Sequence, residues 1–106
     1  MVNRFDVYLL NLDEELSDDP KNTRPAVVVS PDELNRNVHT AIVAPLSATK
    51  AVYPTRVPAE FLNETRYVIL DQIQTVDRER LVKKIGTIEN SDRRALVDKL
   101  QELFAE

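Results

Sequence analysis

The chain has 106 residues, which is enough for one domain with a sizeable core, and we expect a single domain over residues 1–106. Apolar residues make up 42% and charged residues 30%, a balance typical of folded globular proteins and not of disordered ones. No apolar run approaches the roughly 20 residues that cross a bilayer, and no secretory signal is recognisable, so we expect no membrane partner. Because cysteine is absent, disulfides and thiolate metal sites are excluded, and we expect a cytoplasmic protein.

The net charge of −4 hides an uneven distribution along the chain. Residues 1–19 hold one basic and six acidic side chains (−5), and residues 57–106 hold eight basic and ten acidic ones (−2). Residues 20–56 hold five basic and two acidic side chains and so carry +3. Local fields steer a polyanion more than the total charge does, so this central island permits a nucleic-acid partner, with ordinary solvated charge as the alternative.

In chain order, residues 4–12 predict a first strand, and residues 13–23 predict a polar loop without regular period. The β-branched run PAVVVS, residues 25–30, predicts a short strand that is apolar on both faces and therefore central and buried. Ser30 and Pro31 then have the residue types of an N-cap and a first helical position, which predicts about one helical turn.

Further strands are predicted over residues 39–47 and 53–58. Residues 66–76 predict a strand with a bend near Asp71, followed by another extended piece. A last strand is predicted over residues 81–88, where the single glycine, Gly86, indicates a bulge or a close approach of backbone.

The end of the chain has a different period. Residues 90–106 carry apolar side chains at helical spacing, with Ser91 and Asp92 available at the start: Leu96, Val97, Leu100, Leu103 and Phe104. This pattern predicts an amphipathic helix lying on the sheet. Many short strands and one terminal helix predict a mainly β fold, a small antiparallel barrel with a helical cover.

Most catalytic chemistries find no support in the residues present. A single histidine and no cysteine leave only carboxylates for metals, and the acidic pairs of residues 13–19 lack the spacing of a calcium loop, so we predict no metal and no cofactor. One glycine cannot make a phosphate-binding loop, and His39 receives no role. The hydroxyls have no recognisable histidine base, so a hydrolase triad is not supported.

Arg24 is the remaining candidate, together with Ser47 at the end of a neighbouring strand. A guanidinium group stays protonated at working pH and presents a planar set of donors that match phosphate oxygens. The following Pro25 favours extended backbone, so the side chain is expected to project from the strand at the end of the loop. The structural alternative is an ion pair between Arg24 and Asp18 or Asp19.

Four blocks of the sequence resemble the MazF/PemK family of toxin endoribonucleases. They are FDVYLLNLD, RPAVVVSPDELNR, TAIVAPLSATKAVYPTRV and VILDQIQTVDRERLVKKIGTI, followed by the amphipathic end. The resemblance implies an SH3-like antiparallel barrel that forms a homodimer and cleaves single-stranded RNA as an mRNA interferase. It also implies cleavage without metal or cofactor, and inhibition by a MazE-like antitoxin whose acidic tail covers the active groove.

The resemblance also implies catalytic roles. The catalytic arginine of the family maps onto Arg24, its strand-end threonine onto Ser47, and an acidic residue found in some members near Asp19. The expected reaction is attack by the 2′-hydroxyl, which leaves a 2′,3′-cyclic phosphate and a 5′-hydroxyl.

For RNA binding, Lys21, Lys50 and Arg56 are expected to follow the phosphate backbone, which makes binding salt-dependent. Tyr53 is expected to stack on a base, with a core or dimer contact as the alternative.

The chain departs from the family at two places. Members usually open the first strand with Gly-Asp, where this chain has Phe5-Asp6. Their first loop is typically rich in glycine, whereas residues 13–23, DEELSDDPKNT, are acidic and contain none. Two other classes of function therefore stay open at this point: a non-catalytic barrel that only binds partners, and a toxin of the same fold that acts on gyrase.

Overall fold

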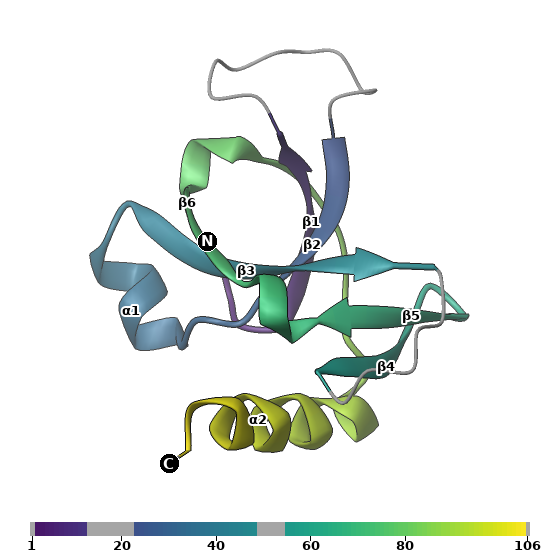
Figure 1. Cartoon of the computed structure of the whole chain (residues 1–106). Helices are drawn as coiled ribbons and strands as arrows, with labels where there is room; N and C mark the ends of the chain where they lie inside the picture. The colour runs from purple at the N-terminus through teal and green to yellow at the C-terminus, as the bar shows by residue number, and fades with distance from the viewer. Residues whose placement is uncertain (1, 13–22, 49–54, 106) are drawn as a thin grey trace.

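The computed structural model describes residues 2–12, 23–48 and 55–105. Antiparallel strands form a curled sheet in the order β4-β5-β3-β2-β1-β7, and β6 pairs with the first half of β3 (Figure 1). The strands are β1 (Asp6–Asn11), β2 (Thr23–Val28), β3 (Thr40–Ser47), β4 (Arg56–Phe61), β5 (Glu64–Ile69), β6 (Gln74–Asp77) and β7 (Leu81–Thr87). Helix α1 (Asp32–Asn37) follows β2, and helix α2 (Asn90–Phe104) closes the chain. The predicted fold class, a mainly β half-barrel with a C-terminal helix, is confirmed.

The sheet separates two hydrophobic cores. One lies inside the curl formed by β1, β2, β3, β6 and β7, and its side chains are mostly small: Val2, Leu10, Ala26, Val28, Ala41, Val43, Val76 and Leu81. The other lies between the sheet and α2 and holds the larger side chains, among them Phe61, Leu70, Ile88 and Leu96. Because β-strand side chains alternate between faces, β2 contributes Val27 to one core and Ala26 and Val28 to the other, as its run of β-branched residues predicted.

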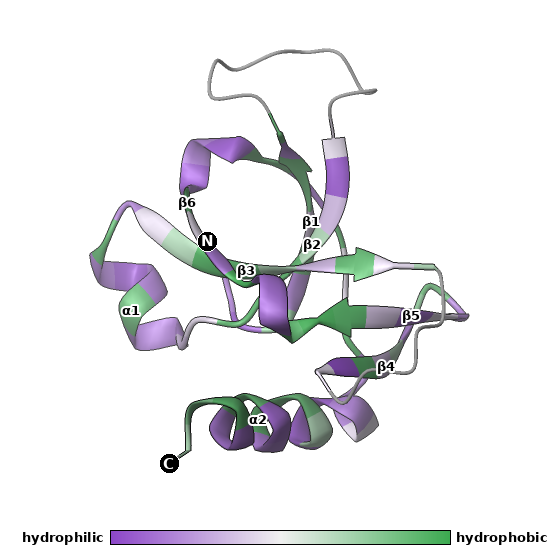
Figure 2. Ribbon diagram, viewed as in Figure 1, coloured by the Kyte–Doolittle hydropathy of each residue, from purple (hydrophilic) through white to green (hydrophobic). Residues whose placement is uncertain are grey.

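Helix α2 lies under the sheet (Figure 1), and hydrophobic and hydrophilic residues alternate along it (Figure 2). Only part of its predicted apolar stripe is buried. Leu96 is fully buried, and Leu100 packs against the same core. Leu103 and Phe104, in the last turn, are exposed at 36% and 69%. Near the start of the helix, Asp92 accepts a hydrogen bond from the backbone N–H of Glu60 at 2.8 Å, which ties α2 to β4.

The predicted N-cap of α1 is wrong. The cap position is Pro31, which makes no side-chain cap. Ser30 instead donates to the side chain of Asn35 at 2.5 Å and accepts from the backbone N–H of Ile42 at 3.1 Å. Both Ser30 and Asn35 are buried, so the hydroxyl satisfies groups in the interior instead of the helix end.

The hairpin of β4 and β5 extends further than the sequence predicted. β4 continues through Pro58 to Phe61, and Leu62 and Asn63 make the turn with φ values of 51° and 63°. A proline is tolerated there because β4 is the edge strand of the sheet.

The bend predicted near Asp71 is confirmed as a 3₁₀ turn, η2 (Leu70–Gln72), between β5 and β6. A second 3₁₀ turn, η3 (Arg78–Arg80), leads into β7.

At Gly86 the predicted bulge is confirmed, whereas the group that approaches closely is a side chain and not the predicted backbone. The register between β1 and β7 shifts beside it, because Val7 pairs with Gly86 and Tyr8 with Lys84. The ring of Phe61 from β4 occupies the space that a β-carbon at position 86 would need. The missing side chain thus lets the edge hairpin pack against β7.

No helix in the described parts of the chain has the length and apolar character to span a membrane.

Candidate functional site

Arg24 lies at the start of β2, where the strand leaves the inner core. It is exposed, and its Nη1 donates to the carbonyl oxygen of Thr23 at 2.7 Å. Side chains two residues apart share a face, so Arg24 continues the row of Ala26 and Val28, which are buried inside the curl. The apolar residues further along β2 fix the strand, and the guanidinium stands at the rim.

Ser47 is the last residue of β3, which lies next to β2, and it is half-buried. The pairing of the two strands ends at Ala26 and Pro45. Because side chains two residues apart share a face, Arg24 follows Ala26 and Ser47 follows Pro45 on the same face of the sheet, beyond the last paired residues. Pro45 has no N–H group to continue the ladder, and the two strand ends diverge beyond it (Figure 1). The two predicted catalytic residues therefore stand at the ends of two neighbouring strands, on the same face of the sheet.

The same face continues onto the outer hairpin. Tyr67 of β5 is directly opposite Ser47 on one side and Pro58 of β4 on the other. Arg56, predicted to bind RNA, lies two residues before Pro58 and so on the same face, opposite Ile69. A row that runs from Arg24 through Ser47 and Tyr67 to the neighbourhood of Arg56 thus crosses β2, β3, β5 and β4.

Tyr67 is the residue that sequence reasoning missed. The alternation of β5 indicates that Tyr67 and the buried Val68 lie on opposite faces. Which residue stands beside Ser47 depends on the register of β3 with β5, however, and no local pattern fixes that register.

Four other predicted residues lie outside the described residues: Asp19, Lys21, Lys50 and Tyr53. Their segments, 13–22 and 49–54, join β1 to β2 and β3 to β4. The roles expected for them stay predictions. Among the residues that the structure describes, no group of three or more His, Asp and Glu side chains could hold a metal ion.

A separate hollow of about 750 Å³ is lined by residues from the other open side of the curl, among them Tyr8, His39, Asp77 and Glu79. Burial raises the pKa of the Tyr8 hydroxyl, Asp6 adds to the rise, and Lys84 opposes it. Arg24 and Ser47 are not among the lining residues of this hollow. His39 is exposed, and its ring makes no hydrogen bond or ion pair with the residues that the structure describes.

Comparison with known proteins shows the family to which the chain belongs. Residues 3–104 match the model of the PemK-like, MazF-like toxins of type II toxin–antitoxin systems. Endoribonuclease EndoA of Bacillus subtilis (strain 168) is 33% identical over 111 aligned residues, which cover 96% of this chain and 90% of EndoA.

Two solved structures show the same fold. A mycobacterial endoribonuclease in complex with its cognate antitoxin superposes with a TM-score of 0.80 at 22% identity, covering 96% of this chain and 93% of that one. The MazE–MazF structure (Form-II) of Deinococcus radiodurans gives 0.76 at 20% identity, covering 99% and 95%. The match over nearly the whole sequence, together with the shared half-barrel, establishes that this chain belongs to the family of PemK-like, MazF-like toxins of type II toxin–antitoxin systems.

Proposed function

We propose that this toxin is a sequence-specific endoribonuclease that cleaves single-stranded RNA. Its active site lies on the face of the sheet formed by the ends of β2 and β3 and by the β4–β5 hairpin. The activity named for EndoA supports the class of reaction. The observation that supports the placement is the pairing of Ala26 with Pro45, because Arg24 and Ser47 each follow two residues further on the same face, one with a permanent cation and the other with a hydroxyl. A phosphodiester needs these two types of group: donors for its oxygens and a contact that orients it.

The chemistry requires no group beyond the RNA and the side chains. The 2′-oxygen attacks phosphorus, its proton passes to a base, and the bond from phosphorus to the 5′-oxygen breaks as that oxygen takes up a proton. Arg24 stabilises the charge that develops on the non-bridging oxygens, Ser47 orients the phosphate, and Asp19 is the proposed base. The products are a 2′,3′-cyclic phosphate and a 5′-hydroxyl, formed without a metal ion.

Substrate binding follows the same face. Arg56, Lys21 and Lys50 contact neighbouring phosphates, and Tyr53 stacks on a base. Tyr67 adds a second aromatic ring directly beside Ser47. The row of residues across these four strands, β2, β3, β5 and β4, sets the direction in which the RNA strand crosses the sheet.

The partners follow from the family. The toxin acts in the cytoplasm as a homodimer, and a MazE-like antitoxin inhibits it, as the complexes solved for the mycobacterial and Deinococcus radiodurans proteins suggest. The antitoxin presents an acidic, extended segment that competes with RNA for the cationic groups around Arg24.

The proposal is tested by incubating the purified protein with a mixed single-stranded RNA in the presence of EDTA. Discrete cuts with 5′-hydroxyl ends are expected, and sequencing those ends gives the recognition sequence. Intact RNA at high protein concentration would leave the non-catalytic barrel as the better explanation. Trapped cleaved DNA in a parallel gyrase assay would instead identify the gyrase-directed toxin.

A further inference from the structure

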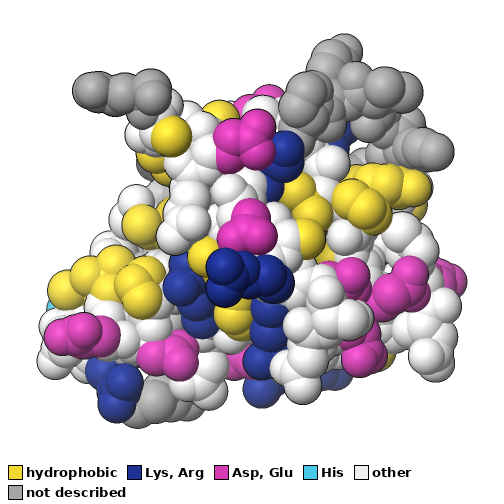
Figure 3. Space-filling view, turned by 90° about the horizontal axis from the view of Figure 1, so that it is seen from below, with side chains coloured by type: hydrophobic (Ala, Val, Ile, Leu, Met, Phe, Trp, Pro, Cys, Tyr) yellow, Lys and Arg dark blue, Asp and Glu magenta, His cyan; other side chains and the backbone are white. Residues whose placement is uncertain are grey.

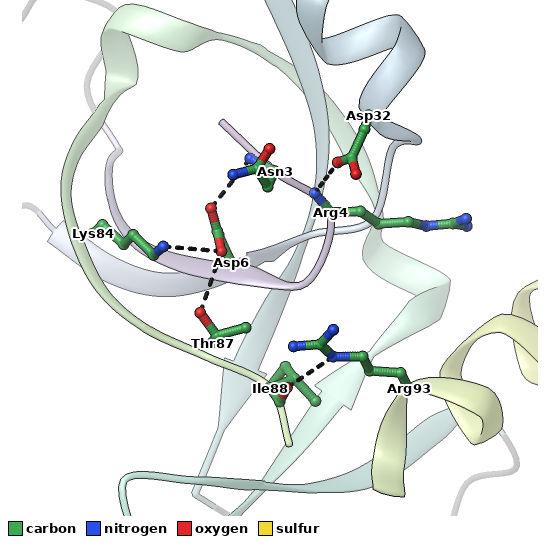
Figure 4. A network of polar contacts seen from close by, with 8 residues as sticks. All are labelled: Asn3, Arg4, Asp6, Asp32, Lys84, Thr87, Ile88 and Arg93. Atoms are coloured by element: carbon green, nitrogen blue, oxygen red, sulfur yellow. Dashed lines mark hydrogen bonds and ion pairs between the residues drawn. The ribbon is translucent and has the colours of Figure 1, made fainter. Parts of the chain in front are cut away.

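Two arginines contact one phenylalanine ring on the side of the molecule where α2 lies. The Cζ atom of Arg4 is 5.5 Å from the centroid of the Phe5 ring, and that of Arg93 is 5.2 Å from it. The close-up shows the Arg4 side chain above the chain segment that carries residue 5 and the Arg93 guanidinium below it (Figure 4). Seen from below, Lys and Arg side chains gather in the middle of this face (Figure 3).

The Phe5 ring is held in place at a cost. Phe5 has a φ of 74°, in the left-handed region that side chains other than glycine rarely adopt. Its N–H donates to the carbonyl of Val28 at 2.7 Å, and its carbonyl accepts from Ile88 at 3.0 Å, so strands on both sides fix the backbone. Residues held in such conformations concentrate at functional sites, which makes this position a candidate.

The neighbouring Asp6 completes this support. Its buried carboxylate accepts from the N–H of Asn3 at 3.1 Å, from the hydroxyl of Thr87 at 3.2 Å, and contacts Nζ of Lys84 at 3.2 Å (Figure 4). On one side of Phe5, Asp6 is thereby tied to β7, and on the other side the N–H of Arg4 donates to the carboxylate of Asp32 at 2.6 Å. The backbone that carries the ring is therefore fixed on both sides.

Each arginine is anchored by one nitrogen and leaves its other end open. Nε of Arg4 donates to the carbonyl of Val29 at 2.9 Å, and Nε of Arg93 donates to that of Ile88 at 3.0 Å. Within the described part of the chain, the Nη atoms of both have no hydrogen-bond or ion-pair partner. By contrast, the next arginine of the helix, Arg94, pairs with Asp98 at 3.1 Å.

We propose that Arg4 and Arg93 form a second RNA contact, which holds a part of the strand remote from the cut; this inference rests on the proposed function. The Nη donors match phosphate oxygens, and each guanidinium has the Phe5 ring on one side and its Nε bonded to a backbone carbonyl, which leaves a base free to stack on the side away from the ring. An acidic peptide would accept hydrogen bonds from the Nη donors, but it has no base to stack on the guanidinium groups. Single-stranded RNA can do both and therefore fits better. Val29, the anchor of Arg4, is five residues from Arg24, roughly 17 Å along the strand direction.

The phenylalanine at this position brings the two cations onto one surface. Glycine adopts a positive φ freely and other residues do not, so Phe5 holds its conformation at a cost in backbone strain. Without the ring, Arg4 and Arg93 would lack the common surface that both contact.

The test compares a short RNA that spans only the cut site with a long RNA that extends beyond it on both sides. Arg4→Gln, Arg93→Gln and the double variant remove the charge and keep a side-chain amide that can still reach the backbone carbonyl. The control, Arg94→Gln, removes the same charge one residue away. For the long RNA, KM is expected to rise about tenfold for each arginine lost, while kcat/KM for the short RNA stays unchanged.

Salt dependence distinguishes direct phosphate contact from a general loss of charge. For binding of the long RNA by Arg24→Ala protein, the slope of log K against log salt should become shallower by about 1.4 when both arginines are replaced, since each phosphate contributes about 0.7. Arg94→Gln should leave the slope unchanged. Replacement by lysine at both positions should restore the slope but not the full affinity, because lysine lacks the planar face.

Three results would overturn the inference. One is an unchanged KM and salt slope for the long RNA in the double variant. Another is binding of polyglutamate to the wild-type protein as tight as that of RNA, lost in the double variant, which would assign the pair to an acidic peptide. The third is a fall in melting temperature that accounts for the whole effect, which would make the pair structural. If the wild-type protein cuts no RNA, the proposed function fails, and the binding arm still decides the contact.

Discussion

The two ends of β2 differ in how the arginine side chains beside them are anchored. At the Thr23 end, Arg24 is exposed where β2 and β3 diverge, and the pairing of the two strands has already stopped. At the other end, Val28 and Val29 are buried, and their carbonyls hold Phe5 and Arg4. One end therefore presents a cation over an open face, and the other presents cations that are part of the packing.

In this small barrel, the side chains proposed for the reaction are therefore different from those that stabilise the fold. A guanidinium outside the ladder contributes little to the core, so its replacement should change the reaction and not the fold. A guanidinium that is anchored to a strand carbonyl contributes to both. Substitutions at the two ends of β2 can therefore be distinguished by whether they change activity, stability or both.

The largest effect is expected for Arg24→Ala. Losing one well-placed donor to the developing charge typically lowers kcat by about 10²–10³-fold, and we expect that range here. The free energy of unfolding should change by less than about 0.5 kcal/mol, because the side chain is exposed. Single-turnover cleavage of RNA and urea unfolding measure the two quantities. A variant that fails to fold would show that Arg24 is structural.

Gly86→Ala should do the opposite. The new methyl group would overlap the ring of Phe61, and forcing extra volume into a packed core costs about 1–3 kcal/mol. We expect lower thermal stability with kcat unchanged at temperatures where the protein is folded. The double variant with Phe61→Leu removes the overlapping ring atoms and should show a smaller penalty than the sum of the two single variants. Full additivity would mean that Phe61 is not the cause.

Much of this fold is predictable because the strands carry their own signals. The β-branched run of β2, the alternation of β3 and the helical spacing around Leu96 each indicate an element and its buried face. The single glycine indicated the bulge in β7, but not that the ring of Phe61 fills the space beside it. These are local signals, and they need no knowledge of which strands pair.

What could not be predicted depends on contacts between distant residues. Ser30 has the residue type of a cap, but the buried Asn35 and the N–H of Ile42 compete for its hydroxyl and win. The turn at Leu62 places a leucine at positive φ, which no propensity favours. For the site, Arg24 and Ser47 were predictable as residue types, whereas Tyr67 required the register of β3 and β5. The family assignment rests on whole blocks of sequence, and the roles of Arg24 and Ser47 remain predictions.

A smaller effect is expected for Ser47→Ala. The hydroxyl orients a phosphate that Arg24 still binds, so we expect about a tenfold loss in kcat, near 1.4 kcal/mol, with little change in RNA affinity. Ser47→Thr keeps the hydroxyl and provides the matched control, with activity close to that of the unchanged protein. Equal losses in both variants would indicate that the added methyl group and not the hydroxyl decides the result.

The smallest effect separates backbone strain from the ring at position 5. Phe5→Gly removes both the ring and the cost of a φ of 74°, whereas Phe5→Ala removes the ring and keeps the β-carbon that makes this conformation unfavourable. Each cation–π contact contributes about 0.5–1 kcal/mol at exposed sites, so the alanine variant should lose stability from both contacts. The glycine variant should be more stable than the alanine variant by about 1 kcal/mol, which chemical denaturation can resolve. Because both variants lack the ring, they should weaken long-RNA binding equally. A difference in binding between them would mean that the RNA contact depends on the backbone conformation at position 5 and not on the arginines beside the ring.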